Sequence, residues 1–432
     1  MCTILMIAVL EGRINLVKML LSKFRKLINL ETKGAIIFNS GLTDGVTALL
    51  TAVVLRNFDM VKLLIENGAE VNTVNNYGAT PLHVASSLGR ADIVKYLIEE
   101  AQGDISRVNK GNVTCLNIAG HCGHLELMKY LLQQPNIDVN HQSHNGYTTL
   151  HWAVERNNIE IIKLLLSYNA RIDIKNAKNM TSLEMAAEST DEEAVNYMLS
   201  IEDLIGVKEK IEVLELLGAS FACRNKETYN LEKAYEYIMQ AMKLRTSSGN
   251  LKTNLTPLVQ PIAAYNYRPE CVSISELESI CYENESLRLE ALLILERLLP
   301  PTSCTSLIYC IWYEGWMYVQ QQIYDRCIHL WFHGLELSTR DDNIDMCGIN
   351  LNDRVMYISE GVRGFGELYC EMLSVKWKTI STTTFLEVLK FAINQFRRFC
   401  QNPTETKKVP RNIEYNHFVD SILFFIYVST KV

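Results

Sequence analysis

A short threonine-led motif returns at an almost constant interval through the first half of the chain. The motif has the form Thr-x-Leu-x and starts at Thr47, Thr80, Thr114, Thr148 and Thr181, so successive copies are 33 or 34 residues apart. This interval is typical of ankyrin repeats, in which each unit is a turn followed by two helices. One such unit cannot bury its own apolar face, so the units must stack in a row.

Each unit carries the residue types that such a stack needs. The motif threonine can cap the first helix, and Pro81 stands at the first helical position, where its missing N–H costs nothing. A second apolar segment follows in each unit, at 60–65, 93–98, 127–132 and 161–166. Small residues of the first helices allow neighbouring repeats to approach closely, namely Ala52, Ala85, Ala119, Ala153 and Ala186.

The array begins with an incomplete unit at Thr3, 44 residues before the motif at Thr47. The extra residues predict a long finger loop over 22–43, and long loops in compact arrays are usually functional. The last repeat runs from Thr181 to about residue 200. We therefore expect about six ankyrin repeats in a first domain, 1–205.

The period is lost in the second domain, 206–432, where longer amphipathic segments predict a helical-pair domain of the tetratricopeptide-like type. Only nine prolines and 21 glycines occur in 432 residues, which favours helices over a sheet sandwich. The fold class is therefore predicted to be all-α. The expected helices cover 210–221, 231–245, 275–299, 307–320, 324–338, 355–377, 384–399 and 414–427.

The overall charge and the cysteine pattern exclude several classes of function. A net charge of −7 disfavours nucleic acid as a partner, because binding to phosphates needs clustered Lys and Arg. Twelve cysteines without a C-x-x-C pair indicate free thiols in a reducing compartment. The apolar runs are too short to span a membrane. The N-terminus lacks the basic segment that begins a signal peptide, so no signal peptide is predicted. We expect the protein inside the cell, in the cytoplasm or the nucleus.

Ankyrin arrays bind partners through the finger tips and the exposed side of the first helices. In this chain those positions hold Thr43, Asp44, Val54, Leu55, Asn76, Tyr77, Ser87, Leu88, Lys110, His121, Cys122, His144, Asn145, Tyr147, Glu155 and Arg156. Val54, Leu55, Tyr77 and Leu88 would form an apolar patch for a partner's apolar tail. The alternative is that some of them pack against the long finger and never meet a partner.

Two histidine groups resemble metal sites, but the repeat offers a simpler interpretation. His121 and His124 form one group, and His141 and His144 form the other. In ankyrin repeats such side chains commonly bond to backbone of adjacent loops, so we predict no metal or cofactor. No nucleophile motif or phosphate loop is present in the sequence, and exposed histidines alone do not activate Cys122. The chain is therefore not expected to be an enzyme, and an activity abolished by Cys122→Ala would contradict this.

The segment 211–221, directly after the array, resembles the corresponding junction of the feminization (Fem) family of ankyrin proteins. The segments 261–265, 276–280, 296–299 and 327–331 support the resemblance. It implies a non-catalytic substrate receptor of a cullin-2 ubiquitin ligase, with elongin and cullin-2 as partners. The family continues into a second ankyrin block and a ligase-docking box, whereas this chain stops at Val432. The alternative is therefore an adaptor or scaffold that has lost its ligase coupling.

The same resemblance implies that the concave ankyrin surface binds a C-terminal degron, the extreme C-terminus of a substrate protein. The two acidic residues that grip a terminal arginine in the family fall on Asn39 and Leu88, a pocket serine falls on Ala79, and a zinc-sharing His-Cys pair falls on His144 and Asn145. A desolvated guanidinium needs a carboxylate partner. We therefore predict that this chain does not bind peptides ending in arginine.

Overall fold

The computed structural model describes residues 3–38, 41–201, 205–223, 229–249, 262–300 and 305–337, together with Gly364, Leu368 and Lys390. The chain divides into two compact units. Unit 1 comprises Met1–Ala177 and Thr181–Ala186, and unit 2 comprises Lys178–Met180 and Ala187–Val432. Each unit is described by itself.

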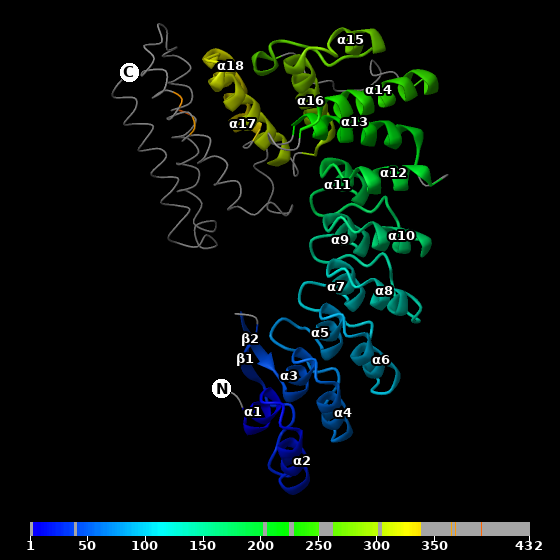
Figure 1. Ribbon diagram of the computed structural model, residues 1–432, viewed down its shortest axis with the longest axis vertical. Helices are drawn as coiled ribbons and strands as arrows, with labels where there is room; N and C mark the ends of the chain where they lie inside the picture. Colours follow the sequence, from blue (N-terminus) through cyan, green and yellow to red (C-terminus); the bar gives the residue numbers. More distant parts are fainter. Residues whose placement is uncertain are drawn as a thin grey trace. The chain divides into compact units, whose positions relative to one another are not determined.

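Unit 1 is a stack of helix pairs (Figure 1). Each first helix packs against the first helix of the next repeat, so that the first helices form one column and the second helices another. The first helices are α1 (Ile4–Leu10), α3 (Ala48–Val54), α5 (Pro81–Ser87), α7 (Cys115–His121) and α9 (Thr149–Glu155). The second helices are α2 (Ile14–Lys23), α4 (Phe58–Glu66), α6 (Ala91–Glu99), α8 (Leu125–Leu132) and α10 (Ile159–Ser167). The predicted solenoid of ankyrin repeats is confirmed.

The motif threonines cap the first helices, as the sequence predicts. Thr80 accepts a hydrogen bond from the His83 backbone N–H, while the His83 ring bonds back to Thr80. Thr114 forms the same reciprocal box with Asn117, and Thr148 forms it with His151. Such a box satisfies two N–H groups that a helix start otherwise leaves unpaired. The local sequence therefore sets where each first helix begins.

The long finger between the first two repeats contains paired strands. β1 (Gly34–Phe38) and β2 (Gly41–Val46) form an antiparallel hairpin, with an irregularity between Gly34 and Ala35. The sequence predicts a loop over 22–43, whereas the structure shows paired strands at Gly34–Phe38 and from Gly41 onward. The β-branched residues of this stretch favour extended backbone, and Ile36 is buried.

A ladder of backbone hydrogen bonds joins successive fingers. In each step an N–H near one finger tip donates to a carbonyl of the finger before it, over 2.9 to 3.2 Å. These backbone bonds hold the fingers at a fixed spacing. The four bonds run from Asn76 to Asp44, from Lys110 to Tyr77, from His144 to Gly111, and from Ala177 to Asn145.

The last repeat consists of α11 (Ser182–Glu188) and α12 (Glu192–Ser200), and the division between the two units falls inside α11. The domain boundary near residue 205 stays a prediction from the sequence.

Unit 2 is helical throughout its described part. Within it α13 packs against α14 and α16, and α17 packs against α18. The single helix expected over 275–299 is two helices, because the chain turns where the Glu283 N–H donates to the Ile280 carbonyl. The helices expected over 355–377, 384–399 and 414–427 lie outside the described residues. The elements are α13 (Val207–Cys223), α14 (Leu231–Ser248), the 3-10 turn η2 (Ala263–Tyr265), α15 (Ile274–Ser279), α16 (Asn284–Leu298), α17 (Thr305–Gln320) and α18 (Tyr324–Leu337).

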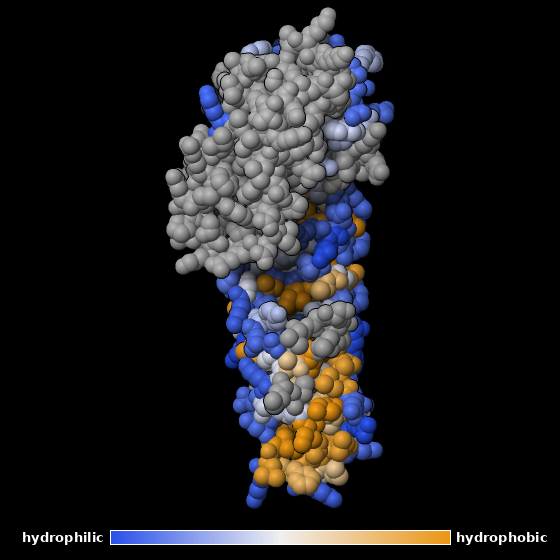
Figure 2. Space-filling view, turned by 90° about the vertical axis from the view of Figure 1, so that its left-hand side faces the viewer, coloured by the Kyte–Doolittle hydropathy of each residue, from blue (hydrophilic) through white to orange (hydrophobic). Residues whose placement is uncertain are grey.

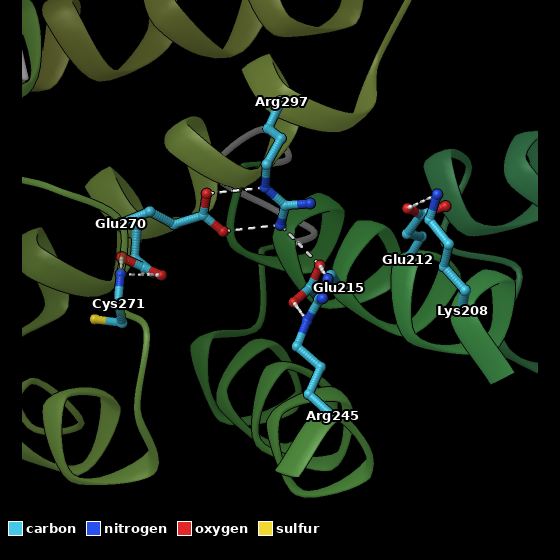
Figure 3. Close-up of polar contacts among 8 residues, drawn as sticks. Lys208, Glu212, Glu215, Arg245, Glu270, Cys271 and Arg297 are labelled. Carbon is cyan, nitrogen blue, oxygen red and sulfur yellow. Dashed lines mark hydrogen bonds and ion pairs between the residues drawn. The ribbon is translucent and has the colours of Figure 1, made fainter. Parts of the chain in front are cut away.

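A buried ionic cluster ties these helices together (Figure 3). Glu215 of α13 accepts hydrogen bonds from Arg245 of α14 and from Arg297 of α16, both at 2.7 Å. Arg297 also binds Glu270, which precedes α15, at 2.8 and 2.9 Å. The four side chains are at most 7% exposed.

The all-α class is confirmed, since the hairpin and one isolated bridge are the β structure among the described residues. No helix within these ranges is long and apolar enough to cross a bilayer.

Candidate peptide-binding surface

The predicted site residues of unit 1 lie in two rows. One row follows the finger tips, from Asp44 to Tyr147, and the other follows the C-terminal ends of the first helices, from Leu55 to Cys122. Figure 2 looks onto this side of the stack, where apolar residues gather over the first repeats. Asn39 lies outside the described residues, as does the side chain of Thr43.

Three residues of the predicted apolar patch, Leu55, Tyr77 and Leu88, are accessible on the early repeats. Leu55 is 37% exposed and Tyr77 is 62% exposed, while Leu88 is half-buried. Ile7, which the sequence reasoning did not select, is 46% exposed on the first helix of the first repeat. Exposed aromatic and aliphatic side chains of this kind are typical of sites that receive a partner's apolar residues.

Val54 does not belong to this patch. Its side chain is only 7% exposed, because α3 lies between α1 and α5 and every one of its residues is buried. The expectation that Val54 is open to a partner is therefore wrong.

Several predicted finger residues stabilise the fingers through their backbone groups. The Asn75 side-chain oxygen accepts from the N–H groups of Tyr77 and Ala79, both at 2.9 Å, and closes the finger turn. Asn76, His144 and Asn145 bond the neighbouring fingers through the backbone ladder. Their exposed side chains are therefore presented to solvent from a fixed frame.

The later repeats carry a different surface, an aromatic cluster on α7, α9 and the finger before α9. The Trp152 ring packs against Tyr147, with ring centroids 4.7 Å apart, and edge-on against His121 at 4.9 Å. Sequence reasoning selected His121 and Tyr147 but missed Trp152. The signal was available, because Trp152 stands four residues after the motif threonine, where Val84 and Ile118 stand in the two preceding repeats.

Arg156 completes this cluster at the exposed end of α9. Its guanidinium donates to Nε2 of His121 at 2.6 Å, so that this nitrogen acts as the acceptor. Burial and the positive charge of Arg156 both lower the pKa of His121, which favours the neutral ring that this bond requires. Partial burial raises the pKa of the neighbouring Cys122, so its thiol is held in the weakly nucleophilic protonated form.

Other histidines of the array serve the fold. His83 bonds to the Val113 carbonyl at 3.1 Å, His124 to the Ser87 carbonyl at 3.0 Å, and His141 to the Asn112 carbonyl at 3.0 Å. Each of these bonds joins one repeat to another, as expected for ankyrin histidines. Within the described ranges no three His, Cys, Asp or Glu side chains are grouped to hold a metal ion.

Comparison with known proteins agrees with this architecture. The family profile described as ankyrin repeats matches in three copies, over residues 5–109, 73–143 and 116–208. Protein fem-1 homolog C of Xenopus laevis is 30% identical over 263 residues, which cover 60% of this chain and 40% of that protein. The Homo sapiens protein of the same name is 31% identical over 272 residues, covering 62% and 41%. Protein fem-1 homolog A of Danio rerio is 29% identical over 267 residues, covering 61% and 41%. The matches thus span about two fifths of the length of these relatives.

Proposed function

The chain is an ankyrin-repeat protein of the Fem family, and we propose that it is the substrate-recognition subunit of a cullin-RING ubiquitin ligase. In this role the ankyrin array binds a peptide of the substrate, a C-terminal degron that does not end in arginine. The chain itself carries out no chemistry.

The observation that carries the proposal is the exposed strip formed by the first-helix ends and the finger tips. Tyr77, Leu55 and Leu88 are accessible there, and the backbone ladder fixes the fingers that frame them. A site held rigid before binding loses little conformational entropy when an extended peptide docks. Burial of an exposed tyrosine among aliphatic side chains is a common source of affinity at protein interfaces.

The charges of this strip argue against a terminal arginine. Leu88 offers an apolar side chain where the family resemblance places an acidic grip, and the later repeats add the guanidinium of Arg156. An arginine side chain that loses its water at the Leu88 position meets no carboxylate from that residue, and an unpaired desolvated guanidinium costs several kcal/mol.

The proposal is tested by screening the full chain against a library of random C-terminal peptides. Selection of apolar C-terminal sequences, lost in Tyr77→Ala, is the expected result. Selection of terminal arginine as the dominant feature would refute the proposed specificity.

Ligase coupling needs its own experiment, in which the full-length gene product is purified from cells. Recovery of elongin and cullin-2 with it supports a substrate receptor. Peptide binding without either protein would instead indicate the alternative function, an ankyrin adaptor or scaffold without ligase coupling.

A further inference from the structure

The row of residues that follows the first helices changes in polarity and charge along the stack. The residue eight positions after each motif threonine lies at or directly after the end of the first helix. In the second to fifth repeats this position holds Leu55, Leu88, Cys122 and Arg156, and in the last repeat it holds Ser189. The row is therefore apolar or weakly polar over three repeats before it reaches a guanidinium.

Arg156 is placed for binding and is held by one neighbour. Its side chain is exposed, and its described side-chain hydrogen bond goes to His121. A guanidinium has five N–H donors in a planar fork, so this bond orients the group and leaves donors for a carboxylate. Glu155, the adjacent acidic residue, forms no described ion pair with it.

The indole of Trp152, on the same helix as Glu155, has a hydrogen-bond donor that is not satisfied within the described part of the chain. Its Nε1–H is buried and has no hydrogen-bond partner among the described residues. A buried N–H without an acceptor costs about 1–3 kcal/mol, which an incoming acceptor would recover.

We propose that Arg156, oriented by His121 and set beside the aromatic cluster of Trp152 and Tyr147, binds a carboxylate of the peptide. The residue next to that carboxylate packs on the aromatic rings, and the rest of the peptide extends along Cys122 and Leu88 toward Leu55. Arg156 suits this role because its fork matches the two oxygens of a carboxylate. This inference rests on the proposed function, since it assigns the anchor of the same peptide site.

The carboxylate has two sources, the free C-terminus of the peptide or an Asp or Glu side chain. Peptides selected from the random library are therefore made in three forms: the free acid, the C-terminal amide, and a form with Asp and Glu replaced by Asn and Gln. Binding of each labelled peptide to the full chain is measured by fluorescence anisotropy. The same titrations are repeated with Arg156→Met, which keeps the aliphatic stem, and with Glu155→Gln as the matched control.

The expected result is that Arg156→Met weakens binding of the free-acid peptide about 10- to 100-fold, the effect of losing hydrogen bonds to a charged group. The wild type should bind the peptide form that lacks the recognised carboxylate more weakly, to a similar degree. Arg156→Met should reduce the affinity for that form little further. Loss on amidation identifies the C-terminus, and loss on Asn or Gln replacement identifies a side chain. Glu155→Gln should bind at least as well as the wild type.

Equal binding of all three forms to the wild type, or an unchanged affinity in Arg156→Met, would overturn the inference while leaving peptide binding intact. Trp152→Phe is a second check, because it keeps an aromatic ring but removes the indole N–H. It should weaken binding less than Arg156→Met does. If the library yields no binding peptide at all, the proposed function fails and this assignment fails with it.

Discussion

Substitution of Arg297 by methionine should destabilise unit 2 more than any nearby surface change. The cluster in Figure 3 contains two carboxylates and two guanidinium groups, Glu215, Glu270, Arg245 and Arg297, whose charges cancel. Arg297→Met leaves these four positions with a net charge of −1 where no side chain is more than 7% exposed.

The size of the effect follows from which bonds are lost. Glu270 loses two hydrogen bonds from Arg297 and Glu215 loses one, whereas Glu215 keeps both of its bonds to Arg245. Removal of one partner of a buried ion pair costs about 3–5 kcal/mol, because the remaining charge stays out of water. The double variant Arg297→Met, Glu270→Gln should recover part of this loss, since the uncompensated charge is then gone. The stability of Arg297→Lys should lie between those of the wild type and Arg297→Met, because an ammonium group keeps the charge but cannot form the paired hydrogen bonds of the planar guanidinium.

Urea unfolding followed by tryptophan fluorescence measures this difference. In a Trp152→Phe background every remaining tryptophan lies beyond residue 187, so the emission reports on unit 2. With a slope of about 2–3 kcal/mol per molar urea, a loss of about 4 kcal/mol lowers the midpoint by about 1–2 M. A midpoint within about 0.3 M of the parent, at the same slope, would show that the cluster does not hold these helices together.

Three further outcomes are expected. Arg56 has a positive φ of 58° at the turn where three other repeats have Gly12, Gly89 and Gly123. Arg56→Gly should therefore raise the free energy of unfolding by about 0.5–1 kcal/mol, measured by urea unfolding, and a loss of stability would show that the turn carries no strain. Burial lowers the pKa of His83 below 6.5, so its stability contribution is complete above pH 6.5 and is lost as the pH falls through its folded value. His83→Asn, which copies the cap made by Asn117, should therefore flatten the decline in thermal midpoint below pH 6.5, and parallel pH curves would contradict the assignment. Tyr77→Ala should weaken binding of library-selected peptides by about 2 kcal/mol in anisotropy titrations, with the far-ultraviolet circular dichroism unchanged; an unaffected affinity would place the peptide away from the early fingers.

The candidate site was only partly predictable, and two residues show why. The repeat register places both Val54 and Leu55 at the end of a first helix, but burial depends on how α3 sits between α1 and α5. Trp152 departs from the aliphatic residues, Val84 and Ile118, at the same register position of other repeats, but the sequence does not indicate which side chains its ring contacts. Its contacts with His121 and Tyr147 come from two different repeats.

The amino-acid sequence is enough to predict the repeat period, the start of each capped helix and the stacking of helices into an all-α array. These features depend on residues close together in the chain, such as Thr80 with His83, whose hydrogen bonds form within one helical turn. The finger ladder, the burial of Val54 and the ionic cluster of unit 2 were decided only by the tertiary structure. Glu215 and Arg297 are 82 residues apart, and no local pattern indicates which distant charge a buried carboxylate will meet.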